Sequence, residues 1–183
     1  MGDYESTTEP TYTTPDGTSW TVTRRATDLA NESFEIEMHV PPHAVSTPPH
    51  VHPRQTDEFN VVSGRVEVLL DGAWRVLGPG DELVVPPNHV HTYRNEFDEP
   101  AVLRNVHNPT DSFQEYLDRL GLLVSSGRIT SMTGLKAKVY MSVLFRQHQD
   151  SMVLASPVLR VLSVVLALGA RLSGVKVPRP PSG

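Results

Sequence analysis

The chain has 183 residues, of which 38% are hydrophobic and 20% are charged, and it contains no cysteine. A chain of this length fits one domain with a small annex. Without cysteine it can form neither a disulfide nor a thiolate metal site. Sixteen Lys and Arg against 21 Asp and Glu give a formal net charge of −5. Because this balance is mildly acidic and no basic block is present, we expect no nucleic-acid partner.

The N-terminal segment is polar. Residues 1–17 are rich in Thr, Glu, Pro and Gly, and we expect them to form a flexible arm. The first thirty residues contain no apolar segment of the kind found in a signal peptide. We therefore expect a cytoplasmic protein.

The segment 18–109 consists of short runs rich in Val, Leu, Thr and aromatic residues, separated by Gly, Pro or Asp-Gly. The runs cover residues 18–24, 33–40, 58–64, 65–70, 73–77, 81–86, 90–95 and 101–106. Short strands at this spacing predict an antiparallel all-β sandwich or barrel. Asp71-Gly72 lies between two runs and predicts a tight hairpin, because such turns require positive φ angles.

The segment 110–176 changes to helical spacing and predicts a C-terminal extension of about three α-helices. Asp111 is the expected N-cap of the first helix, with Gln114 three residues later. The second helix is expected over residues 134–149 and the third over residues 158–172. Three prolines follow Lys176, and we expect the tail 177–183 to be disordered.

The third expected helix is apolar on nearly every side. Ten uncharged residues separate Arg160 from Arg171, which gives about 15 Å of helix. A membrane span needs roughly 30 Å, so we expect the barrel or a second copy of the chain to cover this helix. A homodimer is the expected assembly. Association with a membrane surface is the second choice, because Arg171, Lys176 and Arg179 follow.

A cluster of histidines carries the chemistry. His50 and His52 are two residues apart, so on an extended strand both imidazoles point to the same side. Asp57 follows on the next expected strand, and His91 comes from a distant one. Such an N/O set suits Fe, Mn, Ni, Co or Zn and leaves positions open for a substrate or dioxygen. The sequence predicts one divalent metal ion held by His50, His52, Asp57 and His91.

The carboxylate position has alternatives. Glu58 is adjacent to Asp57, but strand alternation places Asp57 with Phe59 on one face and Glu58 on the other. A water molecule in place of the carboxylate would leave a site of three histidines. In the plainest interpretation, Asp57 is a turn residue before a strand.

Three further residues are expected to line a substrate pocket. Tyr93 lies two residues after His91 and shares its inward face, where it acts either as a hydrogen-bond donor or as a packed core residue. Phe59 shares the face of Asp57. Gln55 lies in the loop between the ligands, at the pocket mouth or in solvent. His43, His89 and His107 are expected at the surface or at strand ends.

Two segments resemble the signature motifs of the cupin superfamily. PPHVHPRQTDEFNVVSG, which begins at Pro48, is similar to G-x5-H-x-H-x3,4-E-x6-G, with Asp57 in the glutamate position and Ala44 in the place of the first glycine. GDELVVPPNHVHTYRN, which begins at Gly80, is similar to G-x5-P-x-G-x2-H-x3-N. Asn88 stands in the place of its second glycine.

This resemblance covers roughly residues 34–108. It implies a double-stranded β-helix, or jelly-roll barrel, with one metal ion in its mouth held by three histidines and a carboxylate. The superfamily includes dioxygenases, isomerases, decarboxylases and sugar binders, so the fold alone does not settle the reaction. We expect a metal-dependent enzyme, either a dioxygenase-like oxidoreductase or an isomerase or cyclase, acting on a small organic molecule. The alternative is a non-catalytic small-molecule-binding cupin with a structural metal or none.

Overall fold

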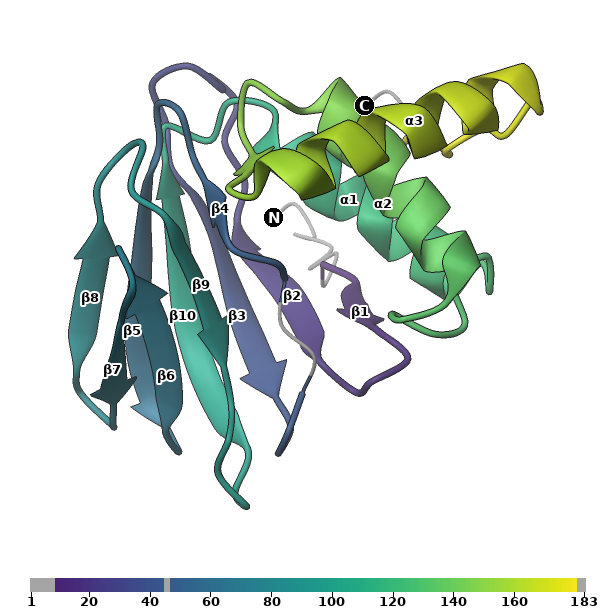
Figure 1. Ribbon diagram of the computed structural model, residues 1–183. Coiled ribbons are helices and arrows are strands. Elements are labelled where there is room, and N and C mark those ends of the chain that lie inside the picture. The colour runs from purple at the N-terminus through teal and green to yellow at the C-terminus, as the bar shows by residue number, and fades with distance from the viewer. Residues whose placement is uncertain (1–8, 45–46, 181–183) are drawn as a thin grey trace, which may run out of the picture.

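The computed structural model describes residues 9–44 and 47–180, and they form two antiparallel β-sheets beside three helices (Figure 1). The strands are β1 (Thr11–Thr13), β2 (Ser19–Arg24), β3 (Phe34–Val40), β4 (His50–Val51), β5 (Thr56–Ser63), β6 (Val66–Leu70), β7 (Ala73–Leu77), β8 (Glu82–Val85), β9 (His91–Arg94), β10 (Ala101–Asn108) and β11 (Val153–Leu154). One sheet has the order β1-β2-β3-β10-β5-β8, and the other has the order β11-β4-β9-β6-β7. Every pairing is antiparallel, which confirms the predicted fold class.

All eight predicted strands are present, the extended segment expected at His50 and His52 contains the short strand β4, and β1 and β11 were not predicted. β1 lies within the expected flexible arm, where Tyr12 pairs with Trp20 of β2 and their ring centroids are 5.5 Å apart. The expectation of a flexible arm is therefore wrong for residues 11–13, because this aromatic contact and the strand pairing hold them. Residues 1–8 lie outside the described residues. β4 and β11 are only two residues long, too short for alternation to be recognised.

The tight turns follow the predicted chemistry. Asp71 and Gly72 have φ angles of 48° and 87° and connect β6 to β7 as a two-residue hairpin, as expected. Asn88 has a φ of 66°, the left-handed conformation that the cupin motif reserves for glycine. At Gly64 a side chain would collide with the backbone of Pro100 and Ala101, so only glycine fits there.

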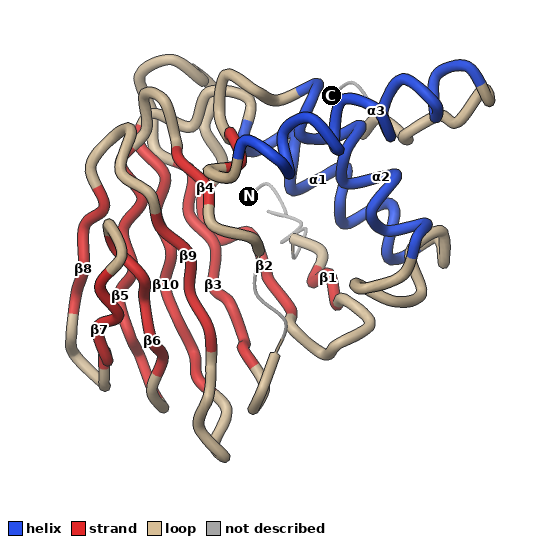
Figure 2. Tube along the Cα trace, viewed as in Figure 1, coloured by secondary structure: helices blue, strands red, loops and turns tan. Residues whose placement is uncertain are grey.

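The three helices are α1 (Phe113–Ser125), α2 (Leu135–Gln147) and α3 (Pro157–Leu172), as the sequence predicts. The N-cap of α1 is Ser112 and not Asp111. Asp111 has a φ of 45° and instead accepts hydrogen bonds from the Arg54 guanidinium. Figure 2 shows the helices together on one side of the molecule and the strands on the other.

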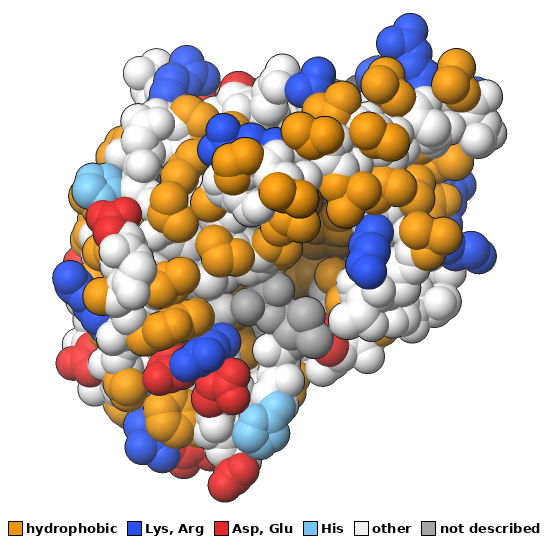
Figure 3. Space-filling view, viewed as in Figure 1, with side chains coloured by type: hydrophobic (Ala, Val, Ile, Leu, Met, Phe, Trp, Pro, Cys, Tyr) orange, Lys and Arg blue, Asp and Glu red, His pale blue; other side chains and the backbone are white. Residues whose placement is uncertain are grey.

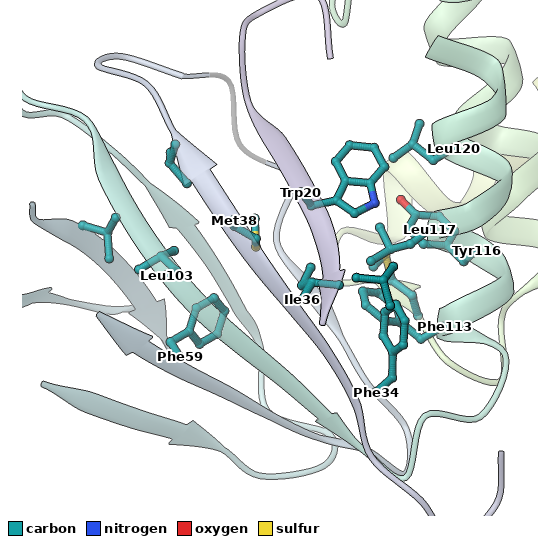
Figure 4. Packing of buried hydrophobic residues seen from close by; sticks show 14 of the residues in the cluster. Trp20, Phe34, Ile36, Met38, Phe59, Leu103, Phe113, Tyr116, Leu117 and Leu120 are labelled. Atoms are coloured by element: carbon teal, nitrogen blue, oxygen red, sulfur yellow. The ribbon is translucent and has the colours of Figure 1, made fainter. Parts of the chain in front are cut away.

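The core is one cluster to which both sheets and α1 contribute, with Val66 and Val68 of the five-stranded sheet fully buried in it. β3 alternates strictly and buries Phe34, Ile36, Met38 and Val40 on one face. Figure 4 shows sheet residues and α1 residues pointing toward one another. The labelled members of this cluster are Trp20, Phe34, Ile36, Met38, Phe59, Leu103, Phe113, Tyr116, Leu117 and Leu120. α1 thereby closes the open side of the sheet.

α3 packs against α2 and leaves much of its apolar surface in contact with solvent. Its buried residues are Ser163 and Ala170, whereas Val161 is 67% exposed and Val165 is 59% exposed. No helix in the described part of the chain has the length and apolar content needed to cross a membrane. In the tail that follows, Val177 packs against the core and Arg119 donates a hydrogen bond to the carbonyl of Pro178. The expected disorder of residues 177–183 stays a prediction. Residues 181–183 lie outside the described part.

Candidate metal centre

Three histidines meet at one end of the five-stranded sheet. His50 and His91 are directly opposite each other where β4 pairs with β9, and their ring centroids are 4.4 Å apart. His52 follows β4, and its ring centroid is 5.1 Å from that of each of the other two. All three side chains are buried. One ring nitrogen of each lies within 4.8 Å of the others, a spacing at which one ion can be shared.

Each of the three imidazoles is held by a backbone carbonyl. Nδ1 of His50 donates to the carbonyl of Pro48 at 2.9 Å, and Nδ1 of His91 donates to the carbonyl of His89 at 2.9 Å. Nδ1 of His52 donates to the carbonyl of Ser151 at 2.5 Å. These bonds place the proton on Nδ1 and leave the Nε2 lone pair free, as in metal-binding histidines.

Two of these Nε2 atoms are buried without a hydrogen-bond partner among the described residues. They belong to His52 and His91. Buried polar atoms are usually paired, so orphaned acceptors that point toward one another require an explanation. A divalent ion bound between them supplies one, and the residues present fit such an ion.

Asp57 extends the histidine group. It occupies the buried face of β5 together with Phe59, while Glu58 lies on the other face, as strand alternation predicts. Its Oδ2 atom is 3.1 Å from Nε2 of His91 and 3.8 Å from Nε2 of His52. Burial opposes ionisation of Asp57, but the surrounding imidazoles outweigh burial and hold its pKa well below the usual range. Asp57 is therefore a carboxylate at neutral pH.

His107 belongs to this cluster, although the sequence analysis placed it at the surface or at a strand end. It lies on β10 and is buried, and its Nε2 atom is 2.9 Å from Oδ1 of Asn105 and 3.5 Å from Oδ1 of Asp57. His52, Asp57 and His107 form a second group that can hold an ion. Alternation along β10 is the signal that could have found it, because Leu103 faces the core and Asn105 and His107 follow at intervals of two.

The site favours neutral imidazoles. Burial lowers the pKa of His50 and of His52, and it lowers the pKa of His107 to about 3. At His91 burial also disfavours the charge, but contact with the Asp57 carboxylate raises its pKa overall. Neutral imidazole is the form that binds metal ions.

Comparison with protein families identifies the fold that carries this site. The model of the cupin domain matches residues 36–107, which include all five residues of the cluster. The chain contains a cupin domain. No curated protein matches the sequence.

Solved structures of small cupins resemble this cupin domain. A double-stranded β-helix protein from Klebsiella pneumoniae is 28% identical, with 49% of this chain and 75% of that chain covered and a TM-score of 0.44. KdgF from Halomonas sp. is 21% identical, with 53% and 83% covered and a TM-score of 0.47. An RmlC-like cupin from Shewanella frigidimarina is 22% identical, with 55% and 84% covered and a TM-score of 0.48.

A cavity of about 110 Å³ adjoins the candidate metal centre of the cupin domain. His50, His52 and His107 line one side, and Tyr93 lines it as well. Burial raises the pKa of Tyr93, so its hydroxyl keeps its proton and can donate a hydrogen bond. The cavity has room for a few atoms of a ligand beside the ion.

The other residues expected at the pocket lie elsewhere. Phe59 is buried, with its ring centroid 6.1 Å from that of Tyr93, and it does not line the cavity. Gln55 is fully buried and donates a hydrogen bond from its amide to the carbonyl of Thr110. His43 and His89 are exposed and contact Asp98 and Asp71, as their surface assignment predicts.

Proposed function

We propose that this cupin domain binds one divalent ion of Fe, Mn, Ni, Co or Zn and uses it to act on a small organic molecule. His50, His52 and His91 are the proposed ligands, with Asp57 as the carboxylate beside them. The observation that carries the proposal is the set of three Nδ1 bonds to backbone carbonyls, because they fix three Nε2 lone pairs toward one point.

The residues around the cavity indicate what the protein would contribute to the reaction. When bound, a divalent ion supplies a Lewis acid for a carbonyl or hydroxyl oxygen, or a redox centre for an oxidation. Tyr93 can orient the substrate through its protonated hydroxyl, and the Asp57 carboxylate would offset part of the charge of the ion. The apolar walls formed by Ile36, Met38 and Phe113 exclude water. A dioxygenase-like oxidation and an isomerisation or cyclisation are the reaction classes that we propose.

The alternative is a binding protein whose metal is structural or absent. A structural site is closed by protein ligands, whereas a catalytic site keeps a position open to substrate. His50 and His52 both line the cavity, so an ion at these residues would face it. This placement favours the enzyme over the binding protein.

Metal content per chain tests the proposal. Wild-type protein reconstituted with Fe(II), Mn(II), Ni(II), Co(II) or Zn(II) is expected to retain one ion, and His50→Ala and His52→Ala are each expected to lose it. His43→Ala is the matched control, because this histidine is exposed and contacts Asp98, and this variant should retain the ion. Wild-type protein that retains none of these ions would overturn the proposal.

A further inference from the structure

A second hollow lies outside the barrel, between α2 and α3. Its volume is about 450 Å³, in the range of small-molecule pockets. Met141 and Phe145 of α2 line one side, and Leu159 and Leu162 of α3 line the other. Figure 3 shows hydrophobic side chains of this region around a depression beside α3. We call this hollow the α2–α3 groove.

The α2–α3 groove adjoins the cavity at the candidate metal centre. Thr47, Met132 and Met141 line both hollows. Of the described side chains, only these three would have to give way for a single molecule to have one end beside His50 and His52 and the other end between the helices. The barrel cavity of about 110 Å³ holds a small head, and the groove holds a larger body.

A buried hydroxyl in the groove lacks a partner. Ser163 is 6% exposed and lines the groove, and its Oγ atom has no hydrogen-bond partner among the described residues. Leaving a buried hydroxyl unpaired costs about 1–3 kcal/mol. Because this unpaired hydroxyl of Ser163 lines the groove, we interpret the groove as a ligand-binding site. A bound ligand could supply the missing hydrogen-bond partner.

We infer that the ligand of this protein is a small amphiphile, with an oxygen-bearing head at the metal centre and an apolar body in the α2–α3 groove. This inference rests on the proposed function, because the head site is the metal centre. The lining supports an apolar body, since Lys138 carries the only charge among the described residues that line the groove. The C-terminal helices thus set the substrate class, while the barrel carries the chemistry.

Two hydroxamic acids of different length test the inference. Acetohydroxamic acid has two carbons, octanohydroxamic acid has eight, and both present the same metal-chelating head. Calorimetry on protein loaded with the ion identified by the metal-content experiment is expected to show that the eight-carbon compound binds at least about tenfold more tightly, because each methylene removed from water strengthens binding. Equal affinity for the two compounds would overturn the inference.

A pair of variants locates the apolar body. Leu159→Trp fills the groove and is expected to abolish the advantage of the longer chain while acetohydroxamic acid still binds. Leu172→Trp is the matched control, because Leu172 lies on the same helix, is 90% exposed and does not line the groove. If Leu159→Trp keeps the full chain-length advantage, the inference is wrong. If the wild-type protein binds metal but the inference fails in this way, the proposed function still stands. If the wild-type protein binds no metal, the inference and the proposed function are both overturned.

Discussion

His52 is held by Ser151, ninety-nine residues later, through a hydrogen bond from the imidazole Nδ1 to the backbone carbonyl. The same C-terminal segment continues as β11, whose Leu154 pairs with His50 of β4. Two of the three candidate metal ligands are therefore positioned by residues that follow α2. The C-terminal extension thus contributes to the candidate metal site.

Weakening this attachment should weaken metal binding. The amide of Ala155 donates a hydrogen bond of 2.8 Å to the carbonyl of Pro49, next to His50. Ala155→Pro removes that donor and is expected to lower metal affinity by about tenfold, the lower end of the effects seen for residues that orient ligands. A competitive titration with a metal-binding dye measures the change. Ala155→Ser keeps the amide and should bind metal like wild type; equal affinity of both variants would contradict this role for the extension.

The strands of the barrel could be predicted from the sequence because each is marked by residues that are close together in the chain. The strand that contains Asp57 alternates between intermediate and buried positions from Thr56 to Val61, and the Asp-Gly hairpin is set by its own two residues. The attachment of β11 to β4 could not be predicted, because it joins two-residue strands that are a hundred residues apart in the chain. Only the folded chain brings them together.

The second group that can hold an ion was missed for a different reason. His107 was interpreted as a single histidine at a strand end, whereas the packing of β10 between β3 and β5 buries it beside Asp57. Gln55 was placed at the pocket because it lies between ligands in the sequence. Its side chain turns instead to Thr110, a contact that only the tertiary structure reveals.

Substitution of His107 distinguishes the two candidate groups. Nε2 of His107 is paired with Oδ1 of Asn105, so this nitrogen is not free in the way that Nε2 of His52 is. We expect His107→Ala to retain one ion per chain and His91→Ala to lose it, as measured by elemental analysis. If His107→Ala loses the ion and His91→Ala keeps it, the site is the group of His52, Asp57 and His107.

Asp57 should contribute charge and not only shape. Asp57→Asn preserves the size of the side chain and removes the negative charge that faces His91 and His52, so we expect metal affinity to fall about tenfold or more. Asp57→Glu restores the charge and the residue usual in the cupin motif, and it should bind metal at least as well as wild type. Circular dichroism confirms the fold of both. Unchanged affinity in Asp57→Asn would show that three histidines suffice.

The outer face of α3 presents a stripe without charge. Its residues recur at helical spacing, and each is at least 55% exposed. They are Val158, Val161, Val165 and Leu168. Large exposed apolar patches are rare on soluble monomers, and a twofold pair is the commonest way for identical surfaces to cover each other. We therefore propose that two copies of the chain pair through this stripe.

A charge in the middle of the stripe should separate the copies. Val165→Glu buries an unpaired carboxylate if the stripe is an interface, so we expect a dimer for wild type and a monomer for this variant in sedimentation velocity. Val76→Glu is the matched control, because Val76 is 56% exposed on β7 of the barrel and should leave the dimer intact. A wild-type monomer excludes the dimer. If that monomer sediments with vesicles of anionic lipid, the stripe and the basic residues Arg171 and Lys176 lie on a membrane surface instead.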